Sequence, residues 1–331
     1  MRLRHIARTL LGPMYPALAA LINAPRTREW QARLVAPLDA IKLWLNGERF
    51  VVDIRGSRGM GALIMEALIL TAHAESIDRV PDIRSSNPLY CPKGVSDLLS
   101  HFMGAGAPQK PGGGWPLVFR HFFSLQSLGL NRRLTIPQAH LLFWKYFKPR
   151  DVVQCRVNEV LAGVPEARFD LSLHYRGTDK HLEAPPVSHE QFADAVSEFC
   201  LAHPATVQVF LATDDPRCEA VLRQRFKELI FTTFELASPL DSEAGKHFSS
   251  MRPEDKAVEA LGNALLISHA QHCIRTSSYL SALSVIMNPR MTTRTLNTDN
   301  WGSTTFPERD ILDRERELAA QPLVEVDSIS A

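Results

Sequence analysis

The chain has 331 residues, of which 45% are hydrophobic and 22% are charged, a composition typical of a folded globular protein and not of a disordered or fibrous one. Its 37 Lys and Arg residues are balanced by 36 Asp and Glu residues, which leaves a net charge of +1. No global field therefore draws the protein toward nucleic acid or anionic lipid. Nucleic acid is not an expected partner, and any anion site has to be local.

The cysteines and the apolar stretches indicate a reducing compartment and no membrane span. The five cysteines are widely spaced and form no C-x-x-C pair, as expected for buried thiols and not for disulfides or zinc ligands. The longest apolar stretch, 60–72, contains Glu66 and is too short to cross a bilayer. Residues 1–26 have a basic start and an apolar middle interrupted by glycine and proline. We expect a cytoplasmic protein that packs this segment on itself or contacts a membrane surface through it.

The first half of the chain predicts one β-α unit. Residues 50–54 form a short apolar strand, RGSRGMG at 55–61 supplies a glycine-rich turn, and residues 62–70 carry apolar positions at helical spacing. The turn matches neither G-x-G-x-x-G nor a Walker A sequence. We expect its Arg55 and Arg58 to face the same cleft as the polar loops of the second half.

An irregular stretch separates this unit from the second half. Residues 81–116 are rich in Pro, Gly and Ser, which predicts an exposed loop within the first domain. Helical segments follow to about residue 148, where new structure begins. The sequence predicts two domains, residues 1–155 and 156–331, and each is long enough to bury its own core.

The second half alternates between strands and helices. Ser188 is placed to cap the first of these helices. Such alternation implies a parallel, doubly wound sheet, and no internal repeat is visible. The expected strands are 169–175, 207–212, 229–234 and 272–275, and the expected helices are 189–203, 217–227, 254–268 and 279–287.

Ligands of such a sheet bind at the carboxyl ends of its strands. This rule selects three stretches: HYRGTDK at 174–180, ATDDP at 212–216 and RTSS at 275–278. All three are expected at one edge of the sheet. The pair HAQH at 269–272 resembles a metal pair, but it spans a helix end and a strand start, so we interpret it as structural.

The first stretch carries four ionisable groups. Arg176 can hold a diphosphate with its planar fork of donors, and Lys180 can add a point charge. His174 and Asp179 can hydrogen-bond a ribose or orient the basic groups. Taken alone, the stretch is better explained as a solvated turn with an Arg-Asp ion pair. The other two stretches reverse that preference.

The other two stretches offer acceptors and a helix start. Of Asp214 and Asp215, one can accept hydrogen bonds from a sugar or base while the other caps the following helix; in the plainer alternative both only cap it. No third ligand and no D-x-D motif accompanies them, so no metal is expected. Ser277 and Ser278 open a helix whose N–H groups and hydroxyls can cradle a phosphate, or Ser278 serves as a plain cap.

The three stretches together resemble the alpha-1,6-fucosyltransferases, the group of eukaryotic core fucosyltransferases and rhizobial nodulation fucosyltransferases. HYRGTDK resembles their H-x-R-R-T-D-K signature, FLATDDP at 210–216 their strand followed by ATDDP, and CIRTSSYLSALSVIM at 273–287 their C-T-F-S-S followed by a helix. The resemblance covers about the last half of the chain. The first half matches only as a strand, glycine turn and helix.

This resemblance implies a GT-B glycosyltransferase: an α/β protein of two Rossmann-like domains facing a cleft, inverting and independent of metal, with GDP-fucose as the donor and no cofactor. It assigns the diphosphate contact to Arg176. It also assigns donor-binding roles to the positions that match the motifs, and we add Arg58 on the glycine turn. The implied donor residues are His174, Arg176, Asp179, Asp214, Asp215, Ser277, Ser278 and Arg58, and the implied catalytic residues are Arg176, Lys180 and Glu183.

The chain departs from the family pattern at three places. Gly177 stands where the family usually has a second arginine. The acidic base of the family lies four residues after the motif lysine, whereas Glu183 lies three residues after Lys180; Glu66 and Asp179 are the next candidates for the base. A nucleotide-binding aspartate of the family falls near Asn263, with Glu259 one turn earlier.

The sequence therefore predicts a fucosyltransferase that acts on a glycan or glycolipid acceptor. Two alternatives stay open. One is a glycosyltransferase of the same fold with a different sugar nucleotide, which the residue at Asn263 favours. The other is a non-catalytic relative that binds a glycan or nucleotide.

Overall fold

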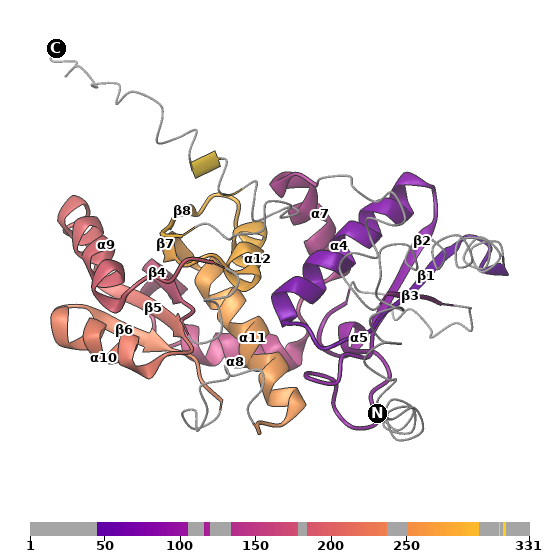
Figure 1. Cartoon of the computed structure of the whole chain (residues 1–331), viewed down its shortest axis with the longest axis horizontal. Coiled ribbons are helices and arrows are strands. Elements are labelled where there is room, and N and C mark those ends of the chain that lie inside the picture. The colour runs from indigo at the N-terminus through magenta and orange to yellow at the C-terminus, as the bar shows by residue number, and fades with distance from the viewer. Residues whose placement is uncertain are drawn as a thin grey trace, which may run out of the picture.

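The computed structural model describes residues 45–104, 116–119, 134–177, 184–236, 250–297, 311 and 314–315. In this part of the chain two parallel sheets, one of three strands and one of five, lie on either side of a group of helices (Figure 1). The chain is an α/β protein with two Rossmann-like halves, as the sequence predicted. The expected contact of residues 1–26 with a membrane lies outside the described residues.

The smaller sheet has the order β2-β1-β3. Its strands are β1 (Arg49–Ile54), β2 (Val80–Ser85) and β3 (Leu117–Phe119), and all pairs are parallel. Helix α4 (Met60–Ser76) links β1 to β2. Because α4 is apolar on nearly every face, it is buried along most of its length.

The stretch 81–116, expected to be an exposed loop, instead contains β2 and helix α5 (Leu98–Phe102). Pro81 is typical of a loop, but β2 is an edge strand, where a residue without an N–H group is tolerated. Asp97 caps α5 by accepting hydrogen bonds from two backbone N–H groups. This prediction was therefore wrong for the described part of the stretch.

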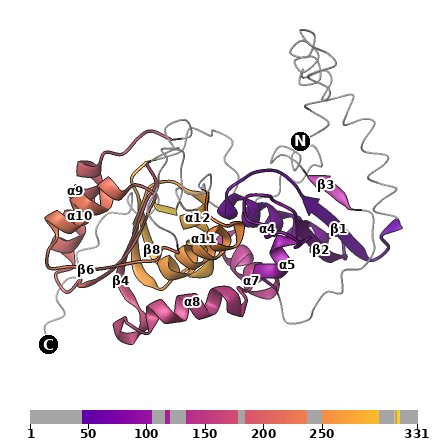
Figure 2. The ribbon, with the colours of Figure 1, turned by 90° about the horizontal axis from the view of Figure 1, so that it is seen from below.

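The larger sheet has the order β6-β5-β4-β7-β8, and all its strands are parallel. The helices α9 and α10 pack on one hydrophobic cluster, and α11 and α12 belong to the other, so both faces are covered (Figure 2). The doubly wound sheet is confirmed. Its elements are β4 (Phe169–Tyr175), α9 (His189–Ala202), β5 (Gln208–Thr213), α10 (Pro216–Arg225), β6 (Ile230–Thr233), α11 (Pro253–Ser268), β7 (Ala270–Arg275), α12 (Tyr279–Met287) and β8 (Thr292–Thr295).

A helical layer joins the two sheets. Helix α7 (Ile136–Tyr146) and α4 pack against α12, and α8 (Asp151–Leu161) packs against α11. One hydrophobic cluster therefore runs from β1 to the start of β8 without a break. The predicted domain boundary, between residues 155 and 156, falls inside α8. No helix among the described residues is both long enough and apolar enough to cross a membrane.

Two helices of this layer approach each other closely at Gly61, in the first turn of α4. A Cβ atom there would lie 2.6 Å from the backbone N of Leu280 and from the backbone C of Tyr279. These two residues form the first turn of α12. The N-terminal ends of α4 and α12 thus touch, and only glycine allows it.

We expect Gly61→Ala to destabilise the protein by roughly 1–3 kcal/mol, because the added methyl group has to push apart two backbones. The matched control is Gly59→Ala. Gly59 has φ −60° and ψ 152°, and a Cβ there meets nothing within 4 Å, so its change should stay within about 0.5 kcal/mol. Urea unfolding of both variants measures the difference. Equal stability of the two alanine variants would contradict the close contact.

Candidate functional site

Three polar loops begin side by side at the carboxyl edge of the larger sheet. Strand β4 lies between β5 and β7, and His174 is opposite Ala212 on one side and Arg275 on the other. The loops that follow are those selected from the sequence. The structure therefore places the described start of HYRGTDK, residues 174–177, at one edge with ATDDP and RTSS, as predicted.

Hydrogen bonds connect the three loops. The Arg176 N–H donates to Thr276 Oγ1 (2.9 Å), and the Thr276 N–H donates to the His174 carbonyl (2.9 Å). On the other side, the Gly177 N–H donates to Asp214 Oδ1 (3.1 Å). The half-buried Arg176 is thus held by its own backbone between β5 and β7. This fixes the point from which its guanidinium extends.

Asp179, Lys180 and Glu183 lie outside the described residues. Just beyond them in the chain, the Pro185 carbonyl accepts a hydrogen bond from Asn297 Nδ2 (2.8 Å). Asn297 Oδ1 in turn accepts from the Ser277 N–H (2.7 Å). One amide therefore ties the end of the first loop to the third.

Asp215 is the N-cap of α10, and its carboxylate is fully engaged. It accepts from the Arg217 N–H (3.0 Å), from the Arg217 guanidinium and from His189 Nε2 (3.0 Å). Burial of this carboxylate opposes its ionisation, but the hydrogen bonds from Arg217 and His189 outweigh burial and lower the pKa of Asp215. Of the two acids, Asp215 caps the helix while the half-buried Asp214 holds the first loop.

The third loop is built around a buried guanidinium. Arg275 is 0% exposed. It donates from Nε to Thr295 Oγ1 (2.9 Å), and from Nη1 to Ser281 Oγ (2.8 Å) and to the Ser278 carbonyl (3.3 Å). Ser278 caps α12 by accepting from the Leu280 N–H (3.3 Å). The plain-cap interpretation of Ser278 is therefore observed, and Arg275 supports the turn from inside.

The glycine at 177 is explained by its neighbour Tyr175. A Cβ at Gly177 would lie 2.6 Å from Cε1 of the Tyr175 ring. That ring packs edge-on against His189 and Phe192, and its hydroxyl donates to the Val187 carbonyl (2.7 Å). Burial raises the pKa of the Tyr175 hydroxyl to about 12. The protein therefore carries a fixed tyrosine ring where a second arginine would need space.

On the other side of the helical layer, Arg58 points inward. Its guanidinium pairs with Glu66, which is 0% exposed within α4, and Asn87 Nδ2 donates to the Arg58 carbonyl (2.8 Å). The side chain of Arg58 keeps 13% of its surface exposed, and burial lowers its pKa. Glu66, an alternative base on sequence grounds, is enclosed and neutralised by Arg58, so an acceptor hydroxyl cannot reach it.

Two polar residues of α11 hold the chain after β6. Asn263 Nδ2 donates to the carbonyls of Phe234 (3.2 Å) and Glu259 (2.9 Å). Glu259 Oε2 accepts from the Leu236 N–H (2.9 Å). These contacts place Asn263 and Glu259 beside the loop at the carboxyl end of β6.

The electrostatics of this edge favour an anion. The N-terminal ends of α4 and α12, both positive ends of helix dipoles, converge at Gly61. Arg176 lies at the same edge of the sheet, at the end of the strand next to β7. In the described part of the chain, no group of three or more His, Cys, Asp or Glu is placed to hold a metal ion.

Several residues of this site could not be found from the sequence. Thr276 could have been predicted, because it belongs to the RTSS stretch and carries a hydroxyl next to the strand end. Asn297 and His189 gave no signal, since each acts through a partner that is distant in sequence. Tyr175 lies within HYRGTDK, but the sequence did not indicate its contact with Val187. Only the fold brings those partners within hydrogen-bond distance.

Comparison with known proteins gives structural matches alone. No family profile matches the chain, and no curated protein does. The structure is similar to NodZ alpha-1,6-fucosyltransferase co-crystallised with GDP (15% identity, 72% of this chain and 93% of that one, TM-score 0.46), an enzyme also solved from Bradyrhizobium. It is similar to a mutant of Arabidopsis thaliana FUT1 in complex with GDP (12% identity, 76% of this chain and 71% of that one, TM-score 0.45). It is also similar to POFUT1 in complex with GDP (10% identity, 75% of this chain and 98% of that one, TM-score 0.38). At these values the likeness assigns no function, which has to be argued from the site.

The lowered pKa of Asp215 predicts that the stability of the protein depends on pH. Because its folded pKa is below the unfolded value of about 3.9, its charge stabilises the fold above that pH, and the stabilisation is lost as pH falls through the folded pKa. Asp215→Asn keeps a capping group but removes the charge. We expect it to unfold more easily than wild type at pH 7, with the deficit shrinking below about pH 3.9.

Urea unfolding between pH 7 and pH 3 measures this effect. The matched control is Asp194→Asn, which removes an exposed carboxylate that pairs with Arg225 on the surface and should cost at most about 1 kcal/mol. A deficit of Asp215→Asn that stays constant across the range would show that its charge contributes nothing.

Proposed function

We propose that the protein is a sugar-nucleotide-dependent glycosyltransferase that transfers fucose from GDP-fucose to a hydroxyl of a glycan acceptor, with inversion. The observation that carries this proposal is the hydrogen-bonded assembly of the three motif loops at one sheet edge. The same three motifs, in the same order, resemble those of the alpha-1,6-fucosyltransferases. An isolated motif would carry little weight, whereas three that meet in space form one site.

The diphosphate of the donor is assigned to Arg176 and the converging helix ends. A guanidinium presents two parallel donors to phosphate oxygens, and the positive ends of α4 and α12 lower the cost of the negative charge. The Ser277 N–H is already bonded to Asn297 and the Leu280 N–H to Ser278. The third loop therefore acts through the dipole of α12 and not through those two donors.

The proposed reaction is a single displacement. The Glu183 carboxylate takes the proton of the acceptor hydroxyl as its oxygen attacks the anomeric carbon. The new glycosidic bond forms as the bond to the diphosphate breaks, and GDP leaves with the electron pair. Arg176 and Lys180 stabilise the charge that develops on the departing diphosphate, so the proposal needs no metal.

A second candidate is a glycosyltransferase of the same class with another sugar nucleotide. It is favoured by Asn263, whose amide is bonded to two backbone carbonyls where the family has a carboxylate for the nucleotide. A titration of GDP, UDP and their sugars into the full chain separates the two. Binding of a nucleotide without transfer to any acceptor would instead indicate a non-catalytic relative.

The acceptor and the location are part of the same proposal. We infer a glycan or glycolipid acceptor and a cytoplasmic protein that contacts a membrane peripherally through residues 1–26. The support is the basic and apolar pattern of that segment. Sedimentation of the full chain with anionic vesicles, against a chain lacking residues 1–26, tests the contact.

Arg176 gives the first prediction of the proposal. Arg176→Ala should weaken GDP binding by roughly 10- to 150-fold, the scale of charge-assisted hydrogen bonds to one guanidinium. Arg176→Lys should restore little, because an ammonium group cannot form the fork. Isothermal titration of GDP measures both variants. The matched control is Arg223→Gln, an exposed arginine of α10 that pairs with Glu219, and unchanged GDP affinity in Arg176→Ala would remove this role.

Glu183 gives the second prediction. Glu183→Gln should bind GDP with wild-type affinity and transfer sugar about 10²- to 10⁴-fold more slowly, as expected for a lost general base. The control is Glu190→Gln in the first turn of α9, which should transfer at the wild-type rate. If Glu183→Gln also keeps that rate, the base is another residue, and Asp179→Asn is the next variant to assay.

A further inference from the structure

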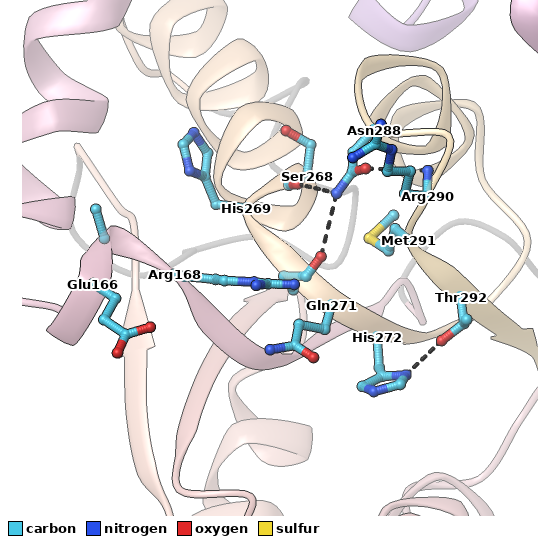
Figure 3. A pocket seen from close by; sticks show the side chains of 12 residues that line it. Glu166, Arg168, Ser268, His269, Gln271, His272, Asn288, Arg290, Met291 and Thr292 are labelled. Atoms are coloured by element: carbon cyan, nitrogen blue, oxygen red, sulfur yellow. Dashed lines mark hydrogen bonds between the residues drawn. The ribbon is translucent and has the colours of Figure 1, made fainter.

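A cavity of about 530 Å³ lies at the opposite edge of the larger sheet, away from the motif loops. It is formed where β4, β7 and β8 begin, so it faces the amino ends of the strands. Figure 3 shows the side chains that line it. The polar ones used in the argument are Arg168, His269, Gln271, His272, Asn288 and Arg290.

Two arginines give this cavity its charge. Arg168 and Arg290 are both exposed, and neither guanidinium makes a hydrogen bond or ion pair with another residue within the described ranges. Glu166 is the one acidic residue of the lining, and it forms no ion pair with either of them. The carboxylate of the nearby Asp170 is hydrogen-bonded elsewhere, because its Oδ2 accepts from the Val207 and Gln208 N–H groups. Within the described residues, both guanidiniums therefore keep their donors for a ligand.

The polar wall of the cavity is held in place. Asn288 Nδ2 donates to the carbonyls of Ser268 (2.9 Å) and Ala270 (3.4 Å), while its Oδ1 accepts from the Arg290 N–H (3.1 Å). His272 is hydrogen-bonded to Thr292 (Figure 3). The amide and the imidazole are therefore oriented before any ligand arrives, which lowers the entropic cost of binding.

The charge state of the wall at neutral pH follows from its surroundings. Burial lowers the pKa of His272, and His203 and Arg168 lower it further. Burial also lowers the pKa of His269, which is hydrogen-bonded to the Ala167 backbone. Both imidazoles are neutral at pH 7. The arginines then supply the positive charge, and the histidines act as neutral hydrogen-bond partners.

The rim carries an unusual backbone conformation. Glu166 and Ala167 have φ values of 55° and 50°, in the left-handed region that non-glycine residues rarely adopt. Such residues cost stability and cluster at binding sites. They form the short turn that leads directly into Arg168, so the strained turn sets where that side chain enters the cavity.

We propose that this cavity is a second ligand site, which binds a sugar bearing an anionic group. The guanidiniums of Arg168 and Arg290 match the planar oxygens of a carboxylate, sulfate or phosphate. Gln271 and the neutral imidazoles match sugar hydroxyls, while Asn288 holds the wall beside them. The volume lies within the range of small-molecule sites. Because the motif loops occupy the other edge of the sheet, this site does not compete with the proposed donor site and does not depend on it.

The test is an NMR titration of the full chain with four sugars of similar size and with inorganic phosphate. The sugars are glucuronate, glucose 1-phosphate, N-acetylglucosamine 6-sulfate and neutral glucose. We expect the three anionic sugars to bind at least about 10-fold more tightly than glucose and than phosphate alone. Glucose binding equally well would overturn the role of the charge, and phosphate binding equally well would overturn the role of the sugar.

Two sets of variants assign the binding to this cavity. The double variant Arg168→Gln, Arg290→Gln should weaken binding of the anionic sugars about 10-fold or more. The single variant Gln271→Glu should also weaken their binding, although both arginines remain. The matched control is Arg156→Gln, Arg223→Gln, which removes two exposed arginines from α8 and α10. GDP binding should be unchanged in every variant. Wild-type affinity in the double variant, or failure of all the sugars to bind, would overturn the proposal.

Discussion

The contact between α4 and α12 at Gly61 is the constraint on which the rest of the structure depends. It joins a helix of the smaller sheet to a helix of the larger one with no side chain between their backbones. The hydrophobic cluster can therefore continue from one sheet to the other. The same contact brings two positive helix ends together, so the packing that unites the halves also creates the field at the candidate site.

Around that contact, many ionisable residues of the motifs serve the scaffold. Asp215 is occupied by Arg217 and His189, Arg275 holds the third loop from inside, and Arg58 is paired with Glu66. A buried charge is costly unless it is paired, so these residues are fixed in place. Their rigidity gives the site a defined geometry around Arg176, whose backbone N–H donates to Thr276.

The two edges of the larger sheet differ in their chemistry. At the carboxyl edge, loop-to-loop hydrogen bonds and helix ends build a site from three separate stretches. At the amino edge, Arg168 and Arg290 line a cavity, and neither forms an ion pair with an acidic residue of the described chain. Most elements of this sheet could be predicted from the sequence because apolar runs and helical spacing are local signals. Strand β8 could not, because its short polar sequence TTRT pairs only through β7.

The sequence by itself determined the alternation of strands and helices, the parallel sheet and the three loops at one edge, since periodicity and chain direction suffice for these. It also limited the donor-site candidates to a few residues. Only the tertiary structure decided that Asp215 caps a helix while Asp214 holds a loop, that Arg58 turns inward, and that Asn297 ties two loops together. The reason is physical: the role of a polar side chain depends on which partner lies within about 3 Å, and partners distant in sequence are brought there by packing alone.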